Sequence, residues 1–331
     1  MSSLISRLSE VSTHWITRKS LTAKILVSLG ACWALHKCWK LLSFTRLYFL
    51  QRPTLHEYID GSRDTWALVT GASDGIGRGF AEELLSKGVS VVLHGRNERK
   101  LQRVRNELLS HWPDSEIKLL VLDAANVAGI EDACKALRDL NLRILVNNVG
   151  GNGSIKRFWA SFSDRTAEDV AELIDINARF STELTRVLLP QLIQNQPSLI
   201  INIGSGASDF ACPYLEIFTG AKAYQQAWST SLRLELQIEK QDVEVLHYQV
   251  GMVQSNSARR DTSFLVPSSR KLAEAGLSMV GCNRDIVWPY WPHALEFGLI
   301  GSLPNWLRNK AITHIALEEM AIQNAEFDEK S

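Results

Sequence analysis

The sequence predicts an α/β fold: a single-domain, doubly wound parallel sheet that follows an N-terminal hydrophobic helix. Between about residues 66 and 250, short apolar runs that suit buried strands alternate with segments of helical periodicity. A glycine-rich turn joins the first of these runs to the first of these helices. An apolar stretch of low charge precedes both. Strands that alternate with helices favour a parallel sheet with helices on its faces.

Composition narrows the class of protein. The 331 residues suffice for one large domain, placed at residues 61–310, between an N-terminal segment (1–60) and a C-terminal helix and tail (311–331). The 36 lysines and arginines match the 36 acidic residues, so we expect no nucleic-acid partner. The five cysteines are scattered and form no Cys-x-x-Cys motif. We therefore expect a reducing compartment, no disulfide framework and no metal site.

Residues 21–50 are expected to associate with a membrane. A span needs about 18 apolar residues, and this stretch supplies them only if Lys24 and Lys37 reach the headgroups from its ends. A helix that lies in the interface, with Trp33 and Trp39 at headgroup depth, fits equally. The third alternative is an amphipathic helix packed on the protein itself. Basic residues flank both ends, so their distribution leaves the orientation open.

The first strand, Trp66–Thr70, leads into the turn Gly71–Gly77, and a helix follows. Glycines let the backbone approach a diphosphate, and a helix N-terminus offers unpaired N–H groups and the positive end of its dipole. The spacing is Gly-x-x-x-Gly-x-Gly, and the flanking strand and helix supply the context that such a motif needs. We therefore predict a dinucleotide cradle rather than a glycine turn without a ligand. Its residues are Val69, Gly71, Ser73, Asp74, Gly75, Ile76 and Gly77.

The end of the second predicted strand, residues 89–94, bears on the choice of cofactor. An acid at this point would bind the ribose 2′-hydroxyl of NAD, whereas an arginine accommodates the 2′-phosphate of NADP. Arg96 lies there with no acid beside it, and Arg78 of the glycine turn can assist. The sequence thus favours NADP(H), the alternative being a solvated arginine at a strand end.

Two further strands complete the cofactor half. Residues 117–122 lead to Asp123, which is placed to accept a hydrogen bond from the adenine amino group. Residues 143–146 lead to Asn147–Gly150, the stretch that contains Asn148. Parallel strands present ligands at their carboxyl ends, so these residues are expected at one edge of a Rossmann-type sheet.

The glycine turn from Thr70 to Gly77 and the stretch Asn147–Gly150 resemble the two signature motifs of the short-chain dehydrogenase/reductase family. The resemblance extends from about Trp66 to Ser255. It implies an oxidoreductase with a nicotinamide cofactor. In the family, the second motif shapes the adenine side of the sheet.

Three more stretches are similar to a narrower branch of the family, the membrane-bound very-long-chain 3-oxoacyl-CoA reductases and 17-beta-hydroxysteroid dehydrogenases. They are Arg52-Pro53, Tyr290–His293 and Leu303-Pro304. This resemblance implies an NADP(H)-dependent enzyme that acts on the keto or hydroxyl group of a lipophilic small molecule: an acyl chain, steroid or polyketide. It also implies a homodimer at the endoplasmic-reticulum membrane, with the catalytic domain facing the cytosol.

The family's catalytic set is a serine, a tyrosine thirteen residues later and a lysine four residues after the tyrosine. Tyrosine and lysine then share one helix face, and the ammonium lowers the pKa of the phenol that protonates the carbonyl. The resemblance assigns Ser205, Lys222 and Asn177, the last to hold a water that relays protons. Counted from Ser205 or from Lys222, however, the tyrosine position is Phe218. A phenyl ring carries no acidic proton.

Several groups can replace the missing phenol. Tyr214 precedes Phe218 by about one turn, and Tyr224 points toward the opposite side of the helix. Ser205, backed by Lys222 and water, can also deliver the proton. The remaining alternative is a regulatory or scaffold protein that binds the cofactor but reduces little or nothing.

Residues 198–203 and 243–249 are expected to be the fifth and sixth strands, and the resemblance also assigns residues beyond the sixth. Val253 and Ser255 are expected near the nicotinamide, with Ser255 where the family usually has threonine, and Lys222 contacts the cofactor as well. Residues 256–280 are expected to form a mobile substrate lid. Residues 288–306 suit a substrate entrance, a membrane contact or core packing, and His293 is expected to be structural.

Overall fold

The computed structural model describes residues 2–59, 64–255 and 260–328, with side chains described from residue 21 to residue 325 of these ranges. The chain forms two compact units, Met1–Gln51 and Arg52–Ser331.

The first unit is helical. It consists of α1 (Ser2–Thr45) and the π-helical turn η1 (Arg46–Leu50). Within the described residues, Leu21–Leu50 is the one helical stretch that is long and apolar enough to cross a membrane, judged by length and composition, with a mean hydropathy of 1.2. Its apolar side chains, such as Trp39, are largely exposed. These are the residues for which the sequence predicts membrane association.

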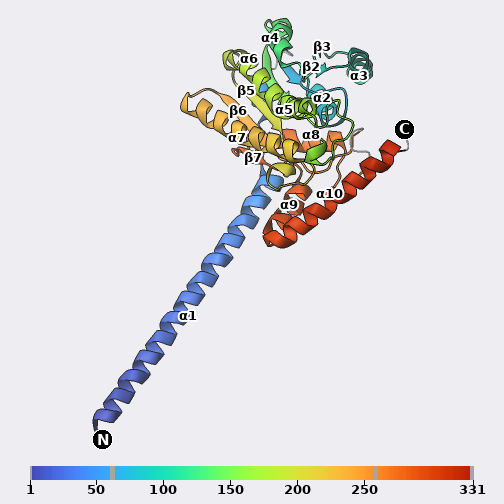
Figure 1. Ribbon diagram of the computed structural model, residues 1–331. Coiled ribbons are helices and arrows are strands. Elements are labelled where there is room, and N and C mark those ends of the chain that lie inside the picture. The colour runs from blue at the N-terminus through green and yellow to red at the C-terminus, as the bar shows by residue number, and fades with distance from the viewer. Residues whose placement is uncertain (1, 60–63, 256–259, 329–331) are drawn as a thin grey trace. The chain divides into compact units, whose positions relative to one another are not determined.

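The second unit contains the predicted doubly wound sheet (Figure 1). Seven parallel strands lie in the order β3-β2-β1-β4-β5-β6-β7. The chain therefore starts in the middle of the sheet, and the strand order reverses between β1 and β4, where such sheets bind ligands. The strands are β1 (Trp66–Val69), β2 (Ser90–Gly95), β3 (Ile117–Val121), β4 (Leu142–Asn147), β5 (Ser198–Ile203), β6 (Val243–Tyr248) and β7 (Ile286–Val287).

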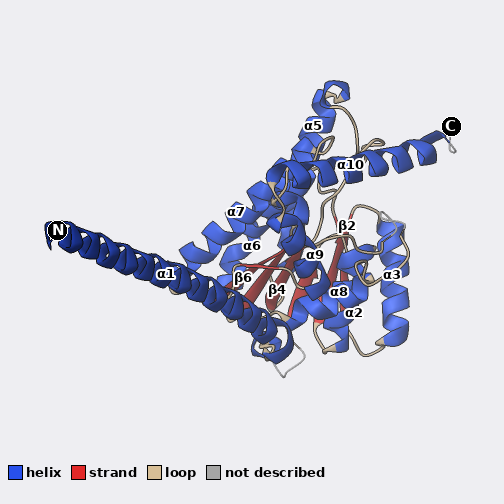
Figure 2. Ribbon diagram, turned by 90° about the horizontal axis from the view of Figure 1, so that it is seen from below, coloured by secondary structure: helices blue, strands red, loops and turns tan. Residues whose placement is uncertain are grey.

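Helices cover both faces of the sheet (Figure 2). The helices α2, α3 and α8 lie on one face, and α4, α6 and α7 lie on the other. Their bounds are α2 (Gly75–Ser86), α3 (Glu98–His111), α4 (Ile130–Cys134), α5 (Ala167–Ile174), α6 (Phe180–Gln194), α7 (Glu216–Ile238), α8 (Ser269–Ser278), α9 (Trp291–Ser302) and α10 (Asn305–Asp328).

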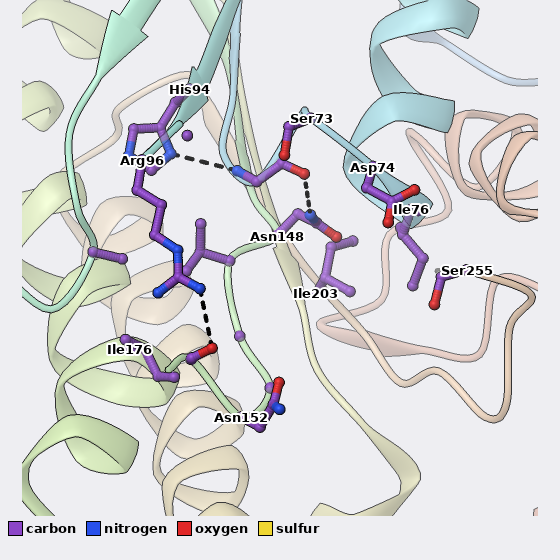
Figure 3. A pocket seen from close by; sticks show the side chains of 18 of the residues that line it. Ser73, Asp74, Ile76, His94, Arg96, Asn148, Asn152, Ile176, Ile203 and Ser255 are labelled. Carbon is purple, nitrogen blue, oxygen red and sulfur yellow. Dashed lines mark hydrogen bonds between the residues drawn. The ribbon is translucent and has the colours of Figure 1, made fainter. Parts of the chain in front are cut away.

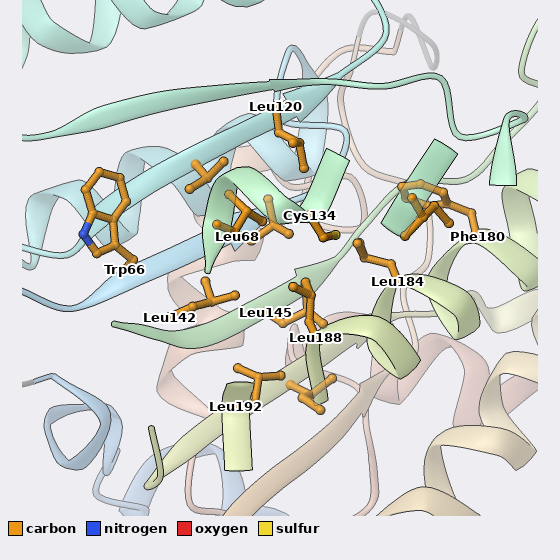
Figure 4. Close-up of a cluster of buried hydrophobic side chains, with 14 of the residues drawn as sticks. Trp66, Leu68, Leu120, Cys134, Leu142, Leu145, Phe180, Leu184, Leu188 and Leu192 are labelled. Atoms are coloured by element: carbon orange, nitrogen blue, oxygen red, sulfur yellow. The ribbon is translucent and has the colours of Figure 1, made fainter. Parts of the chain in front are cut away.

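A group of buried apolar side chains lies between the sheet and α4, α6 and α7 (Figure 4). Leu184, Leu188 and Leu192 recur every four residues on α6, so they form one stripe that faces the strands. Leu68 and Leu145 meet this stripe from β1 and β4. This core fixes the carboxyl ends of the strands, and the residues that follow those ends form the site.

The structure corrects the expectation for residues 256–280. Residues 256–259 lie outside the described part of the chain, but α8 is a packed helix and not a mobile lid. Its Leu272 and Leu277 are buried, and a Cβ at Gly276 would lie 2.8 Å from the ring of Phe80 on α2. Apolar residues at helical spacing among polar ones in this stretch indicate such a packed helix. The strand β7 was not predicted either, because two residues are too few to show the alternation of hydrophobicity that marks a strand.

Replacing Leu184 by alanine should lower the free energy of unfolding by about 2–5 kcal/mol, because this fully buried side chain would leave a cavity against the sheet. Urea unfolding followed by circular dichroism measures the change. The control is Leu234→Ala on α7, since Leu234 is 54% exposed and its loss should cost less than about 0.5 kcal/mol. Equal losses in the two variants would contradict this assignment of the core.

Candidate active site

A cavity of about 450 Å³ opens at the carboxyl edge of the sheet, beside β1, β2, β4 and β5 (Figure 3). It gathers side chains that are far apart in the sequence. Val69 and Gly77 lie behind its wall, in β1 and in the first turn of α2. The other cofactor residues expected from the sequence line it: Gly71, Ser73, Asp74, Gly75, Ile76, Arg96, Asp123, Asn148, Lys222, Val253 and Ser255.

The glycine turn has the close packing that a cradle requires. Gly71 and Gly75 have φ of 63° and 54°, a region that side chains rarely adopt. A Cβ at Gly77 would lie 2.4 Å from the carbonyl oxygen of Gly71, so only glycine lets α2 start this close to β1. Asp74 lies at the N-cap position of α2, and its side chain forms no capping hydrogen bond with the first N–H groups of the helix. The helix N-terminus therefore faces the cavity with donors suited to a phosphate, and the residues fit a dinucleotide.

Thr70 joins the two halves of the cradle. Its hydroxyl donates to the carbonyl of Val146 (3.2 Å) and accepts from the backbone N–H groups of Asn148 (2.8 Å) and Val149 (3.1 Å). The Asn148 side chain returns a hydrogen bond to the carbonyl of Thr70 (2.9 Å). These bonds fix the glycine turn after β1 against the Asn147–Gly150 stretch after β4.

The end of the cavity beside β2 is basic. Arg96 follows β2, and its Nη2 donates to the carbonyl of Gly153 at 3.2 Å. Lys100, from the first turn of α3, also lines the cavity, with its Nζ 3.8 Å from Asp74. Asp123 caps its own turn through Oδ1, which accepts from the N–H of Ala125.

Arg78 does not serve this end of the cavity. Its guanidinium pairs with Glu82 and Glu107, each at 2.9 Å, and Arg78 lines an adjoining hollow rather than the cavity itself. Lys100 and His94 also line the cavity and were not singled out from the sequence. The signal for His94 was a polar residue at the end of an apolar strand. Burial lowers the pKa of His94 to about 4, so the ring is neutral, and its Nδ1 accepts from the N–H of Gly71 at 3.4 Å.

Lys222 brings a buried ammonium to the other end of the cavity. It lies on α7, and its Nζ donates to the carbonyl of Ile203 (2.9 Å) and to Oε1 of Gln225 (3.1 Å). Burial lowers its pKa to about 8. The ring of Phe218, one turn earlier on the same helix face, has its centroid 5.9 Å from Nζ.

Asn177 lies in the π-helical turn η6 (Asp175–Arg179) between α5 and α6. Its amide bonds the backbone of Gly151 twice: Nδ2 donates to the carbonyl (2.9 Å) and Oδ1 accepts from the N–H (2.7 Å). A Cβ at Gly150 would lie 3.0 Å from Oδ1 of Asn177 and 3.2 Å from Nζ of Lys222. The structure therefore brings Asn177 and Lys222 together at Gly150.

The two expected hydroxyl donors, Ser205 and Tyr214, are not among the residues that line this cavity. Ser205 follows β5 and accepts a hydrogen bond from the N–H of Ala207 (3.2 Å), and it is not part of the cavity lining. Tyr214, with φ of 65°, lines a second cavity of about 690 Å³. Tyr224 is 47% exposed, with its hydroxyl 3.3 Å from Thr182. The catalytic roles of Ser205 and Tyr214 stay predictions.

Phe158 was not singled out from the sequence, and it closes the cavity beside Phe218. The two ring centroids are 5.2 Å apart with the planes at 80°, an edge-to-face contact. Phe158 lies on the loop between β4 and α5, and both rings line the cavity. The wall next to Lys222 is therefore apolar.

His293 supports the loop that carries Val253. Its Nδ1 accepts from the N–H of Gly251 (3.2 Å), and its Nε2 donates to the carbonyl of Leu265 (3.0 Å). The partners assign this neutral tautomer. Burial lowers its pKa, which suits the structural role expected from the sequence.

This geometry is that of a nicotinamide-nucleotide oxidoreductase fold. Residues 65–264 match the model of the short chain dehydrogenase family, and the chain belongs to that family. It is 33% identical to a very-long-chain 3-oxoacyl-CoA reductase of Podospora anserina, over all of this chain and 99% of the relative. It is 30% identical, over 80% of each chain, to a protein of Pongo abelii named inactive hydroxysteroid dehydrogenase-like protein 1. The short-chain dehydrogenase from Sphingobium yanoikuyae in complex with NADPH shares the fold, with a TM-score of 0.59 and 24% identity over 73% of this chain and 97% of that one. The short-chain dehydrogenase/reductase family, which the two glycine-containing motifs predicted, is thus confirmed.

Lys222 should make the free energy of unfolding depend on pH. Its pKa is about 8 in the folded chain, against 10.5 for an ordinary lysine. Between these values the unfolded chain binds a proton that the folded chain releases, so stability rises with pH by up to about 1.4 kcal/mol per unit. The difference in unfolding free energy between wild type and Lys222→Met should rise across this window and be flat below about pH 8. A difference that stays constant throughout would contradict the burial of the amine.

Proposed function

We propose that the protein is an NADP(H)-dependent oxidoreductase that acts on the keto or hydroxyl group of a lipophilic substrate, with a long acyl chain as the first choice. The observation that carries this proposal is one cavity that holds the glycine turn, Arg96 and the buried amine of Lys222. The very-long-chain 3-oxoacyl-CoA reductases, which match this chain along nearly their whole length, support the acyl substrate.

The preference for NADP(H) follows from charge at the adenosine end. Arg96 and Lys100 offer cations to a 2′-phosphate, and the tip of β2, Gly95–Asn97, contains no acid that would bind a free ribose hydroxyl. Val253 and Ser255 line the opposite side, where the sequence places the nicotinamide. When bound, the cofactor supplies or accepts the hydride.

The proton needs a source other than Phe218. Lys222 is an ionisable amine that lines the cavity, and with a pKa of about 8 most of it is protonated at neutral pH. We assign it the proton that reaches the substrate oxygen, through water or through Ser205. Asn177 holds Gly151 and thereby shapes the backbone next to Lys222. Loss of a general acid costs about 10²- to 10⁴-fold in rate, so turnover should be slow.

A lipophilic substrate suits the apolar wall of Phe158 and Phe218. The same proposal places the protein at the endoplasmic-reticulum membrane through residues 21–50, with the catalytic domain on the cytosolic side and in a homodimer. The apolar stretch Leu21–Leu50 supports the membrane association.

A second candidate function is a cofactor-binding, catalytically impaired homologue with a regulatory or scaffold role. Phe218 favours it, as does the relative whose name describes it as inactive. The first candidate is preferred because Lys222 and Asn177 meet beside the cavity. Burying an amine is unfavourable, so a buried lysine at this place favours a catalytic use.

Arg96→Glu should reverse the cofactor preference. The change removes a cation that faces the 2′-phosphate and adds an acid for the 2′-hydroxyl, so NADPH affinity should fall about 10- to 100-fold while NADH affinity rises. Isothermal titration calorimetry with each cofactor measures both. Arg99→Glu is the matched control, because exposed Arg99 makes the same charge change on α3 outside the cavity lining. Equal losses of NADPH affinity in the two variants would reject the role of Arg96.

Phe218→Tyr should raise the rate of NADPH oxidation with a long-chain 3-oxoacyl-CoA by about 10²- to 10⁴-fold, because it returns a phenol one turn from Lys222. Phe162→Tyr is the control, since Phe162 is 61% exposed and does not line the cavity. If neither the wild type nor Phe218→Tyr turns over, the reductase proposal fails and the second candidate stands. If wild-type turnover survives Lys222→Met unchanged, Lys222 is not the proton source.

A further inference from the structure

Several backbone groups of residues 157–160, around Phe158, form hydrogen bonds with residues further along the chain. These residues belong to the connection between β4 and α5, and Phe158 packs edge-to-face on Phe218 at the cavity wall. A loop has few bonds of its own, so whatever holds it sets where Phe158 lies. The bonding groups belong to α10, to the loop before α7, and to Arg165 near the end of the same β4–α5 connection.

The first holding group is Gln323, on α10. Its Oε1 accepts from the N–H of Trp159 at 2.9 Å, and its Nε2 donates to the carbonyl of Trp159 at 2.9 Å. One carboxamide thus satisfies both backbone groups of one residue, which fixes the loop in position and in rotation. Trp159 is the neighbour of Phe158, so α10 holds the loop next to the ring that lines the cavity.

The second and third holding groups act on the same segment. The guanidinium of Arg165 donates to the carbonyls of Arg157 (2.8 Å) and Phe158 (2.5 Å). The carbonyl of Tyr214, in the loop before α7, accepts from the N–H of Ala160 at 3.4 Å. Arg165 and Tyr214 lie close in sequence to helices of the core, whereas Gln323 comes from the far end of the chain.

The same face of α10 also contacts a second segment near the cavity. Glu319 lies one turn before Gln323 and forms an ion pair with Arg260. Arg260 follows Ser255, which lines the cavity, after the residues outside the described ranges. One face of α10 therefore contacts both the loop around Trp159 and the segment that follows Ser255, the residue expected near the nicotinamide. Figure 1 shows α10 starting beside α9 and running to the C-terminus.

We propose that α10 is a strap that frames the substrate side of the cavity, and that Gln323 is its positioning residue. Through Trp159 it keeps Phe158 on Phe218, so the width of the apolar wall beside Lys222 depends on the C-terminal helix. The placement of the loop stands on the hydrogen bonds alone, and only the kinetic consequence rests on the proposed reductase function.

Hydrogen–deuterium exchange of the full chain in detergent tests the strap. Gln323→Leu removes both bonds at similar volume, and amides 159–160 should exchange about 5- to 100-fold faster, as expected for two lost hydrogen bonds. Gln323→Glu keeps the acceptor for the Trp159 N–H and should retain part of the protection. Asn309→Leu is the matched control: it makes the same amide-to-alkyl change on exposed α10 surface, where the Asn309 side chain has no hydrogen bond within the described chain.

Unchanged exchange at 159–160 in Gln323→Leu would overturn the proposal, and so would an equal acceleration in β1, which reports global destabilisation. In the kinetic arm, Gln323→Leu should raise the KM for a long-chain 3-oxoacyl-CoA about 5- to 100-fold and leave the Kd of NADPH unchanged. A KM that stays at the wild-type value while the loop opens would overturn the role of the strap at the site. Failure of the proposed function is distinct: no NADPH binding in the wild type, with the exchange result intact.

Discussion

The hydroxyl of Thr70 is the interaction on which the site depends. One side chain at the end of β1 donates to β4 and accepts from two backbone groups that follow it. Because Thr70 is fully buried, these bonds are not exchanged with water, and an unpaired donor there would be costly. The bond network makes the glycine turn and the Asn147–Gly150 stretch one rigid unit. Both stretches line the cavity.

Lys222 is the second constraint, because an amine in this position is held by neutral partners. The carbonyl of Ile203 and the amide of Gln225 accept from it, and the ring of Phe218 offers its face at 5.9 Å. These contacts solvate the charged form less well than water does, which is why burial lowers the pKa. A lysine that titrates near neutral pH, beside a ring without a proton, is suited to donate the proton itself.

The sequence predicted the parts of the site that local patterns encode. Six strands, the glycine turn and the placement of Arg96 follow from periodicity and from turn chemistry at single positions. Phe158 and Gln323 could not be predicted, because their roles arise from a contact between a loop and a helix at the other end of the chain. The catalytic set was predicted by spacing, which located Phe218, and the structure places Lys222 in the cavity lining while the role of Ser205 stays a prediction.

We propose that a nicotinamide nucleotide with a 2′-phosphate binds at the glycine turn. Thermal unfolding of the wild-type protein with and without cofactor tests it most directly, because a ligand that binds only the folded chain stabilises it by mass action. The account predicts that NADPH at about 100 times its Kd adds about 2.7 kcal/mol of stability and that NADH at the same concentration adds much less. No shift with either cofactor would contradict the account.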